Sequence, residues 1–271
     1  MKNKNVWIVA IVVLAVFIAG FLWLFPEPAP DEASMSAPNE VIPVGKPKQA
    51  AEPEPAPAPA EPPPEAKPEP AIANPLTPEP TPEPLPKLDE SEPSIVTALG
   101  KILDKSWMDV ILTEALIRKV VATVDHLPAA TLPANVVPLK RVSGSFVVQE
   151  IDGQRSISPH NAERYAEYMA RIDRVDAKKL VTVYRQYYPL FQKAYAEIAK
   201  PGSYFNDRLV QAIDNLLAAP SPAEPIGLIQ PKVLYAYADP ALETRSSGQK
   251  IMMRMGQANA DRVKAKLREI R

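Results

Sequence analysis

The sequence predicts a mainly α-helical globular domain with one short β-hairpin, preceded by a single transmembrane helix and a proline-rich linker. Three observations lead to this fold class. Residues 6–25 contain no charged side chain, residues 26–87 are rich in Pro, Glu and Ala, and from residue 88 onward apolar side chains recur at spacings of three and four. We therefore divide the chain into a cytoplasmic tip (1–5), a transmembrane helix (6–25), a disordered linker (26–87) and a helical domain (88–271).

The apolar stretch is long enough to span a bilayer, because a helix over 6–25 measures about 30 Å. Lys2 and Lys4 precede this stretch and acidic residues follow it. Since Lys and Arg mark the cytoplasmic side of a membrane helix, we expect the N-terminus inside the cell and the domain outside it. In a bacterium this places the helix in the inner membrane and the domain in the periplasm. A cleaved signal peptide, whose apolar core is usually shorter, is the alternative.

The linker has proline at nearly every second or third position, which favours an extended polyproline II conformation. We interpret it as a spacer that carries the domain across the periplasm. A linker whose length is unimportant and a ligand for proline-binding modules are the alternatives. In its anchor and its Glu-Pro repeats the chain resembles the TonB class of energy-transducing proteins. Because the anchor lacks ionisable residues and the domain is larger and more helical than in that class, a TonB-like transducer is an alternative function only.

The first part of the domain predicts two helices and a connection. Pro93 in a first turn and the apolar residues behind it predict an opening helix over 93–103. A second apolar pattern predicts one helix over 107–127, which we expect to pair with the first as a helical hairpin. Three prolines predict an extended surface connection over 127–145.

A β-hairpin follows this connection. Asp152-Gly153 suits the positive backbone angles of a tight turn, so residues 146–151 and 154–157 are expected to pair. A further helix is expected to start at Ser158-Pro159.

The rest of the domain is expected to be helical except for a proline-rich loop over 220–238. The longest helix is predicted over 177–200, with Asp176 as its N-terminal cap and a kink at Pro189. Asn206 or Asp207 is expected to cap the next helix, and two last helices are expected near 240–255 and 259–270.

Five segments of the domain carry a family resemblance. They are VVATVDHLP (120–128), HNAERY (160–165), YRQYYPLFQKAYAEI (184–198), LYAYADP (234–240) and SSGQKIMMRMG (246–256). With these segments residues 88–271 resemble an uncharacterised bacterial family, the domain of unknown function 3014. The resemblance implies a bacterial envelope protein and no particular activity.

Several kinds of chemistry are excluded by composition and motifs. The chain has no Cys, and its two histidines, His126 and His160, are far apart in the sequence. It holds no glycine-rich phosphate-binding string, and its net charge of -1 does not favour nucleic acid. We therefore expect no metal, no cofactor and no enzymatic activity. A cell-wall-acting enzyme, which would need a proton-carrying Glu or a carboxylate pair, is kept as an alternative.

Two groups of residues are candidates for contact with a partner. The first recurs on one face of the predicted helix over 177–200 and consists of Tyr184, Tyr187, Tyr188 and Tyr195. Its members are candidates for the lining of a groove for sugar or peptide, but core packing is the interpretation that we favour. The second interrupts a helical pattern with poor helix formers and consists of Ser246, Ser247, Gly248 and Gln249, followed by Lys250 and Arg254. Such inconsistencies are common at functional sites, but a simple helix break between two core helices is the interpretation that we favour.

These observations predict a membrane-anchored envelope protein whose domain is a binding or scaffold module presented across the periplasm. Its expected partners are the lipid bilayer, through residues 6–25, and an envelope protein or the cell wall. Nucleic acid is not an expected partner.

Overall fold

The computed structural model describes residues 71–80 and 84–271. The predicted tip, the predicted transmembrane helix over 6–25 and most of the predicted linker over 26–87 lie outside these residues. Across the two described ranges, no helix is both long and apolar enough to cross a membrane.

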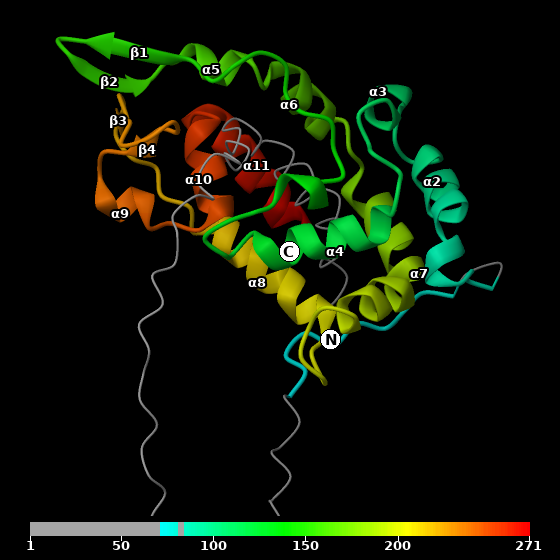
Figure 1. The fold of residues 1–271 in the computed structure, drawn as a ribbon. Helices are drawn as coiled ribbons and strands as arrows, with labels where there is room; N and C mark the ends of the chain where they lie inside the picture. The colour runs from blue at the N-terminus through cyan, green and yellow to red at the C-terminus, as the bar shows by residue number, and fades with distance from the viewer. Residues whose placement is uncertain (1–70, 81–83) are drawn as a thin grey trace, which may run out of the picture. The chain divides into compact units, whose positions relative to one another are not determined.

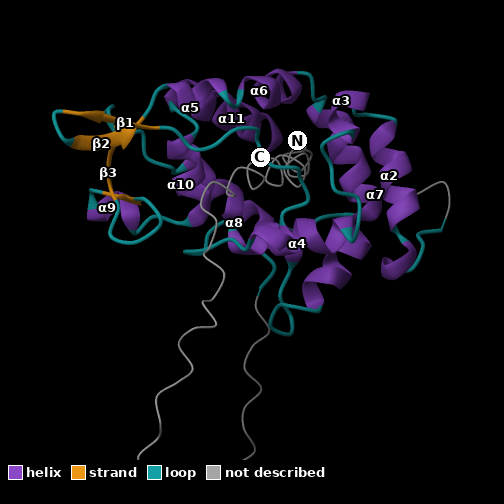
Figure 2. Cartoon of the chain, turned by 45° about the horizontal axis from the view of Figure 1, so that its top comes forward, coloured by secondary structure: helices purple, strands orange, loops and turns teal. Residues whose placement is uncertain are grey.

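The described residues form a mainly helical unit with a small antiparallel sheet, as the sequence predicts (Figure 1). The helices are α2 (Glu92–Gly100), α3 (Lys105–Met108), α4 (Leu116–His126), α5 (His160–Glu163), α6 (Ala166–Asp173), α7 (Ala177–Ala196), α8 (Phe205–Leu217), α9 (Pro240–Glu243), α10 (Ser247–Arg254) and α11 (Gln257–Ile270), with 3-10 turns η3 (Leu88–Glu90) and η4 (Ala134–Val136). The strands are β1 (Val148–Ile151), β2 (Gln154–Ile157), β3 (Gly227–Ile229) and β4 (Ala236–Tyr237). The sheet lies at one end of this unit, and α2 and α3 lie at the other (Figures 1 and 2).

The main hydrophobic core is shared by α4, α7, α8 and α11 (Figure 2). Val120 and Val124 of α4, Leu209 and Ile213 of α8, and Val263 of α11 are all less than 5% exposed. Because these residues are spaced by four along α4 and α8, each of these two helices buries one apolar stripe against its neighbours. Burial of each such side chain stabilises the fold by roughly 1.5–3 kcal/mol.

A second, smaller apolar cluster joins the sheet to α10. It consists of Ile226, Leu228, Tyr237 and Met253, each less than 9% exposed. This cluster holds the sheet against the helices and so positions the cleft described below.

The predicted continuous helix over 107–127 is wrong. Helix α3 ends at Met108, and α4 begins only after Ala115, whose φ of 50° lies in the left-handed region. Between the two helices Ile111 forms a β-bridge with Leu139, and the N–H of Lys140 donates to a carbonyl of the same stretch. The partners of this extended segment come from residues 138–140, which the spacing of apolar side chains does not reveal.

The predicted β-hairpin is confirmed, and it belongs to a larger sheet. Strands β1 and β2 pair antiparallel around Asp152 and Gly153, whose φ angles are 52° and 73°. The sheet then continues in the order β1-β2-β3-β4, with Leu228 paired to Arg155 on one side and to Tyr237 on the other. Strands β3 and β4 lie within the predicted proline-rich loop, and both are too short to show an alternating pattern.

Helix α7 starts where the sequence predicts it to start. Asp176 accepts hydrogen bonds from the N–H groups of Lys178 and Lys179, as expected for an N-terminal cap. The helix contains Pro189 and continues to Ala196. The caps predicted for α8 are wrong, because Gln192 of α7 accepts the N–H of Phe205, the first residue of α8.

Asn206 and Asp207 instead hold residues 71–80, which we call the strap. The prediction assigns the strap to the disordered linker, whereas in the structure it packs on the helices and buries Leu76. The compact unit therefore begins before residue 88. The difference arises because hydrogen bonds from α7 and α8 hold an extended backbone that could not fold alone.

Candidate functional site

The four tyrosines that were candidates for a groove lie in the main core. Tyr184, Tyr187, Tyr188 and Tyr195 are only 3–7% exposed. Ring centroids are 5.2 Å apart between Tyr184 and Phe191 and 5.4 Å apart between Tyr195 and Phe205. Burial raises the pKa of Tyr184 well above its ordinary value. Core packing, the interpretation favoured above, therefore describes these residues, and they form no exposed stripe.

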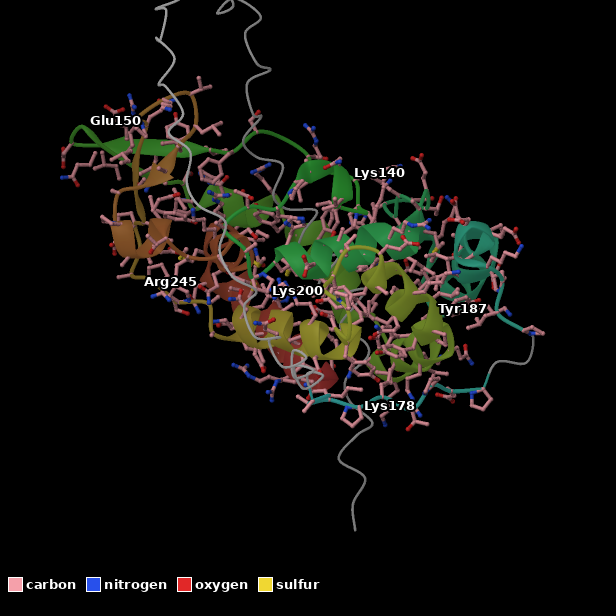
Figure 3. The ribbon with its side chains drawn as sticks, turned by 60° about the horizontal axis from the view of Figure 1, so that its bottom comes forward. Lys140, Glu150, Lys178, Tyr187, Lys200 and Arg245 are labelled. Carbon is pink, nitrogen blue, oxygen red and sulfur yellow. The ribbon has the colours of Figure 1, made fainter. Side chains whose placement is uncertain are left out.

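Tyr187 is the tyrosine of this group that reaches the cavity between α2 and α7. Its hydroxyl lies 2.6 Å from the hydroxyl of Ser94 on α2. The cavity measures about 720 Å³, and Figure 3 shows Tyr187 on α7. Two exposed lysines, Lys101 and Lys179, border this cavity, and its walls also carry the polar side chains of Ser94, Thr97, Thr182 and Gln186.

The segment Ser246 to Gln249 forms the buried start of α10. Ser246 caps this helix by accepting the N–H of Gln249. The N–H groups of Ser247 and Gly248 donate to the carbonyls of Ala129 and Leu127, at 2.7 and 2.9 Å. The first N–H groups of a helix and the last carbonyls of a helix have no hydrogen-bond partner within their own helix. Here the N–H groups at the start of α10 donate to carbonyls just after α4, so the two buried helix ends supply each other's hydrogen bonds. The favoured helix break is present, because α9 ends at Glu243 and α10 begins at Ser247, and it has this structural role.

Lys250 and Arg254 connect α10 to the sheet. The Nζ of Lys250 lies 2.6 Å from Oε1 of Glu243, whose other oxygen accepts the N–H of Tyr237. Burial alone would raise the pKa of Glu243, but these two hydrogen bonds and the positive charges of Lys250 and Arg254 together outweigh burial and hold the pKa below its usual value. The guanidinium of Arg254 lies over the ring of Tyr237, 5.6 Å from its centroid.

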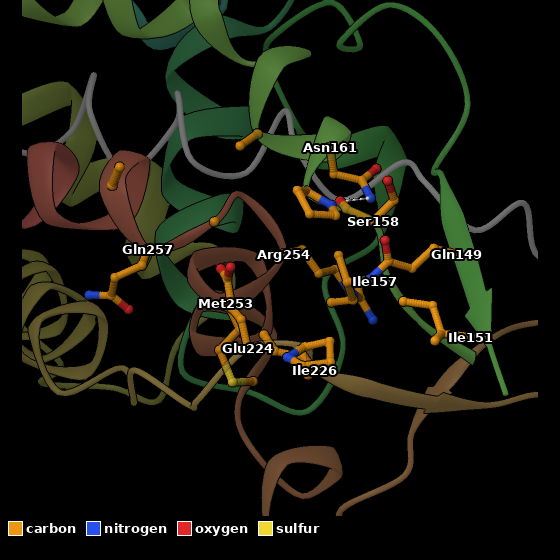
Figure 4. Close-up of a pocket in the computed structure, with 15 residues that line it drawn as sticks. Gln149, Ile151, Ile157, Ser158, Asn161, Glu224, Ile226, Met253, Arg254 and Gln257 are labelled. Atoms are coloured by element: carbon orange, nitrogen blue, oxygen red, sulfur yellow. Dashed lines mark hydrogen bonds between the residues drawn. The ribbon is translucent and has the colours of Figure 1, made fainter. Parts of the chain in front are cut away.

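A cleft opens beside Arg254, between the β1–β2 hairpin and the junction of α10 with α11 (Figure 4). It measures about 630 Å³, and Ile151, Ile157, Ile226 and Met253 are among the apolar residues that line it. Gln149, Glu224, Arg254 and Gln257 supply polar groups to its lining. This combination of apolar walls and a few polar groups is typical of a ligand or side-chain pocket.

Another polar residue of the cleft is already engaged within the protein. The Nδ2 of Asn161 donates to the carbonyls of Val147 and Ser158, and its Oδ1 accepts the N–H of Val147. Asn161 therefore fixes the start of the hairpin and shapes the cleft wall.

The cleft brings together one residue that the sequence analysis selected, Arg254, with several that it missed. Ile157, Ile226 and Met253 meet only because β2, β3 and α10 pack together. Each of them reads in the sequence as an ordinary core residue. Ile151 also lines the cleft and is 58% exposed at the end of β1, which only the structure reveals.

Metal binding is not indicated within the described part of the chain. No group of three or more His, Cys, Asp and Glu lies close enough there to hold an ion. His160 lies 3.2 Å from Glu163 on the exposed surface of α5.

Comparisons with known proteins identify the family of the domain. No curated protein and no solved structure gives a significant match. A family model described as "Protein of unknown function (DUF3014)" matches residues 116–271. This span begins at the first residue of α4 and includes the cleft, whereas the strap, α2 and α3 precede it. Because the match covers more than half of the chain, the protein belongs to the DUF3014 family, as its sequence segments predict.

Proposed function

We propose that the chain is a non-enzymatic, membrane-anchored envelope protein whose domain binds another protein. The apolar stretch over 6–25 and the lysines before it support a single-pass anchor with a cytoplasmic N-terminus. The proline-rich residues behind it support a spacer that presents the domain in the bacterial periplasm.

The observation that carries the binding role is where the exposed apolar side chains lie. Of the seven large hydrophobic residues that are exposed in the described ranges, four belong to the sheet or its borders: Val147, Ile151, Ile229 and Val233. Exposed apolar surface that adjoins a cleft is a common feature of protein interfaces.

The cleft fits this role in size and chemistry. Its volume of about 630 Å³ falls in the range of ligand pockets and can hold the side chains of an inserted segment. An apolar anchor of the partner would contact Ile157, Ile226 and Met253, while Arg254 and Gln149 would meet polar groups at the edge.

Photo-crosslinking in intact cells tests the binding surface. A photoreactive amino acid replaces Ile151 in the full-length chain, and the matched control carries it at Ile198, on the helical side. The two side chains are 58% and 56% exposed, so the probes have similar access to solvent. We expect Ile151 to capture a distinct protein that Ile198 does not, and Arg254→Ala to reduce that capture at least tenfold. Equal capture at both positions, or capture of wall polymer instead of protein, would contradict the proposal.

A reporter fusion tests the placement separately. A reporter enzyme that is active only outside the cytoplasm is fused behind Arg271. Its activity is measured in whole cells and in membrane fractions. Activity together with membrane recovery is expected. A reporter active only in the cytoplasm, or a protein recovered only in the soluble fraction, would show that the envelope assignment is wrong.

A further inference from the structure

The strap is held by side chains whose hydrogen bonds go mainly to its backbone. Asp207 of α8 accepts from the N–H groups of Ala73 and Asn74, at 3.1 and 2.6 Å. It also accepts from the side-chain amide of Asn74 at 2.9 Å. An ionised carboxylate can accept about four hydrogen bonds. Asp207 therefore directs most of this capacity to two consecutive residues of an extended segment.

Two neighbours of Asp207 bind the same stretch. The Tyr204 hydroxyl accepts the N–H of Leu76 at 2.9 Å and donates to its carbonyl at 3.3 Å. Asn206, which has no exposed surface, donates from Nδ2 to the carbonyl of Asn74 at 2.9 Å. A buried amide that lost this partner would destabilise the fold, so the start of α8 is built to receive a peptide carbonyl.

Helix α7 supplies a further backbone partner through its proline. Pro189 has no N–H, so the carbonyl of Arg185, four residues earlier, has no partner within the helix. The N–H of Glu79 donates to this carbonyl at 3.2 Å. The Arg185 side chain in turn donates to the carbonyl of Thr77 at 3.2 Å and pairs with the carboxylate of Glu79 at 3.5 Å.

Most of the strap itself remains exposed. Leu76 is its one buried residue, and Ile72 is 52% exposed, so release of the strap would uncover little apolar surface. The residues that hold the strap are Arg185 and 204–207, and we call the surface that they form the groove. They lie inside the span matched by the family, whereas the strap lies outside it. The groove therefore belongs to the family domain, and the segment that fills it comes from the spacer side of the chain.

We propose that this groove is a binding site for an extended Asn-Pro-Leu peptide and that the strap is its resident, releasable ligand. The hydrogen bonds recognise the backbone of residues 73–79, Leu76 provides the apolar anchor, and Pro75 keeps the segment extended. Release frees ten residues, which at about 3.1 Å each lengthen the spacer by about 30 Å. The strap thus acts as a latch that sets where the spacer leaves the domain.

Amide hydrogen exchange on the full-length chain in detergent micelles tests whether the strap releases as a unit. In Asp207→Ala we expect the amide of Glu79 to exchange at least tenfold faster, although its own partner, the Arg185 carbonyl, is untouched. Asp109→Ala removes an exposed carboxylate that pairs only with Lys105 in the described structure, and it should leave exchange in the strap unchanged. If Asp207→Ala accelerates only Ala73 and Asn74, the contacts act independently and the latch proposal is wrong.

A peptide titration tests whether the groove accepts a ligand in trans. A fluorescent peptide with the sequence of residues 71–80 is added to the full-length chain and to a variant with a weakened strap, Asn74→Gly with Leu76→Gly. Because a tethered segment competes at an effective concentration in the millimolar range, the variant should bind at least tenfold more tightly than the natural chain. Adding Tyr204→Phe to the variant should weaken binding again. Equal affinities, or no binding to the variant at 1 mM peptide as an order-of-magnitude limit, would mean that the strap is a fixed part of the fold.

Discussion

Gly248→Ala tests the physical reason for the unusual start of α10. A Cβ at position 248 would lie 2.8 Å from Cδ2 of Leu216 and 3.0 Å from the carbonyl oxygen of Leu127. The second contact is with backbone, which cannot rotate away. If α10 moved outward to relieve it, the hydrogen bond from the Gly248 N–H to the same oxygen, now 2.9 Å long, would stretch.

The net effect follows from two opposing contributions. Inserting an extra methyl group into a packed core typically costs about 1–3 kcal/mol. Alanine is at most about 1 kcal/mol more favourable than glycine in a helix, and less so in the first turn. We therefore expect Gly248→Ala to lower the free energy of unfolding by about 1–2 kcal/mol and the midpoint of thermal unfolding by about 2–8 °C.

Urea and thermal unfolding of the full-length chain, followed by circular dichroism, measure this effect. Gly100→Ala is the matched control, because Gly100 ends α2 and a Cβ there would meet nothing within 4 Å. The control should be as stable as the natural protein or slightly more stable. If Gly248→Ala matched the control, the close approach of α10 to α4 would not be the reason for a glycine at this position.

Three further outcomes are expected. Gly256→Ala should lower the free energy of unfolding in urea by about 1–3 kcal/mol, because φ is 83° and ψ 151° at this residue and the new Cβ would lie 3.1 Å from that of Ala162. A decrease below about 0.5 kcal/mol, the size of the effect of a neutral surface change, would contradict this. Burial raises the pKa of Tyr165 to about 12 from a usual value of 10.0, so its contribution to stability is complete below pH 10 and is lost as the pH rises through 12. Tyr165→Phe should therefore lose less stability than the natural chain between pH 9 and 11, roughly the onset of phenol ionisation, in urea titrations. Lys264→Met should change the free energy of unfolding by less than about 1 kcal/mol, because methionine keeps the packing of the apolar stem and removes one buried charge. That charge is on Nζ, which donates to the Ala219 carbonyl at 2.7 Å. A decrease above about 3 kcal/mol would show that the charge is essential to stability.

Elements that depend on local signals could be predicted from the sequence. The Asp152-Gly153 turn fixes the hairpin, and Asp176 caps α7, because both act through the backbone of residues next to them. Elements that depend on distant partners could not. The bridge of Ile111 with Leu139 interrupts an apolar pattern that predicts one continuous helix. Strands β3 and β4, of three and two residues, are too short to show the alternation of apolar and polar side chains that predicts a strand.

The candidate site shows the same division. Arg254 was selected because it follows a break in helical propensity, and it does border the cleft. The tyrosines were selected as a stripe, but a stripe of amphipathic rings looks the same whether it faces solvent or core. In this protein the rings face the core, because Phe205 of α8 packs on Tyr195 and Tyr184.

Two segments of this sequence contain residues that disfavour the helix in which they lie, and the structure explains both without a partner. Pro189 inside α7 leaves a carbonyl that the strap uses, and the poor helix formers before Gln249 close the end of α4 against the start of α10. Each marks a place where backbone from a distant part of the chain docks, so neither needs an external partner to account for it. The exposed apolar residues of the sheet, such as Ile151, have no such internal explanation within the described residues, because packing leaves them more than a third exposed. A search for the binding partner should therefore begin at the sheet and its cleft.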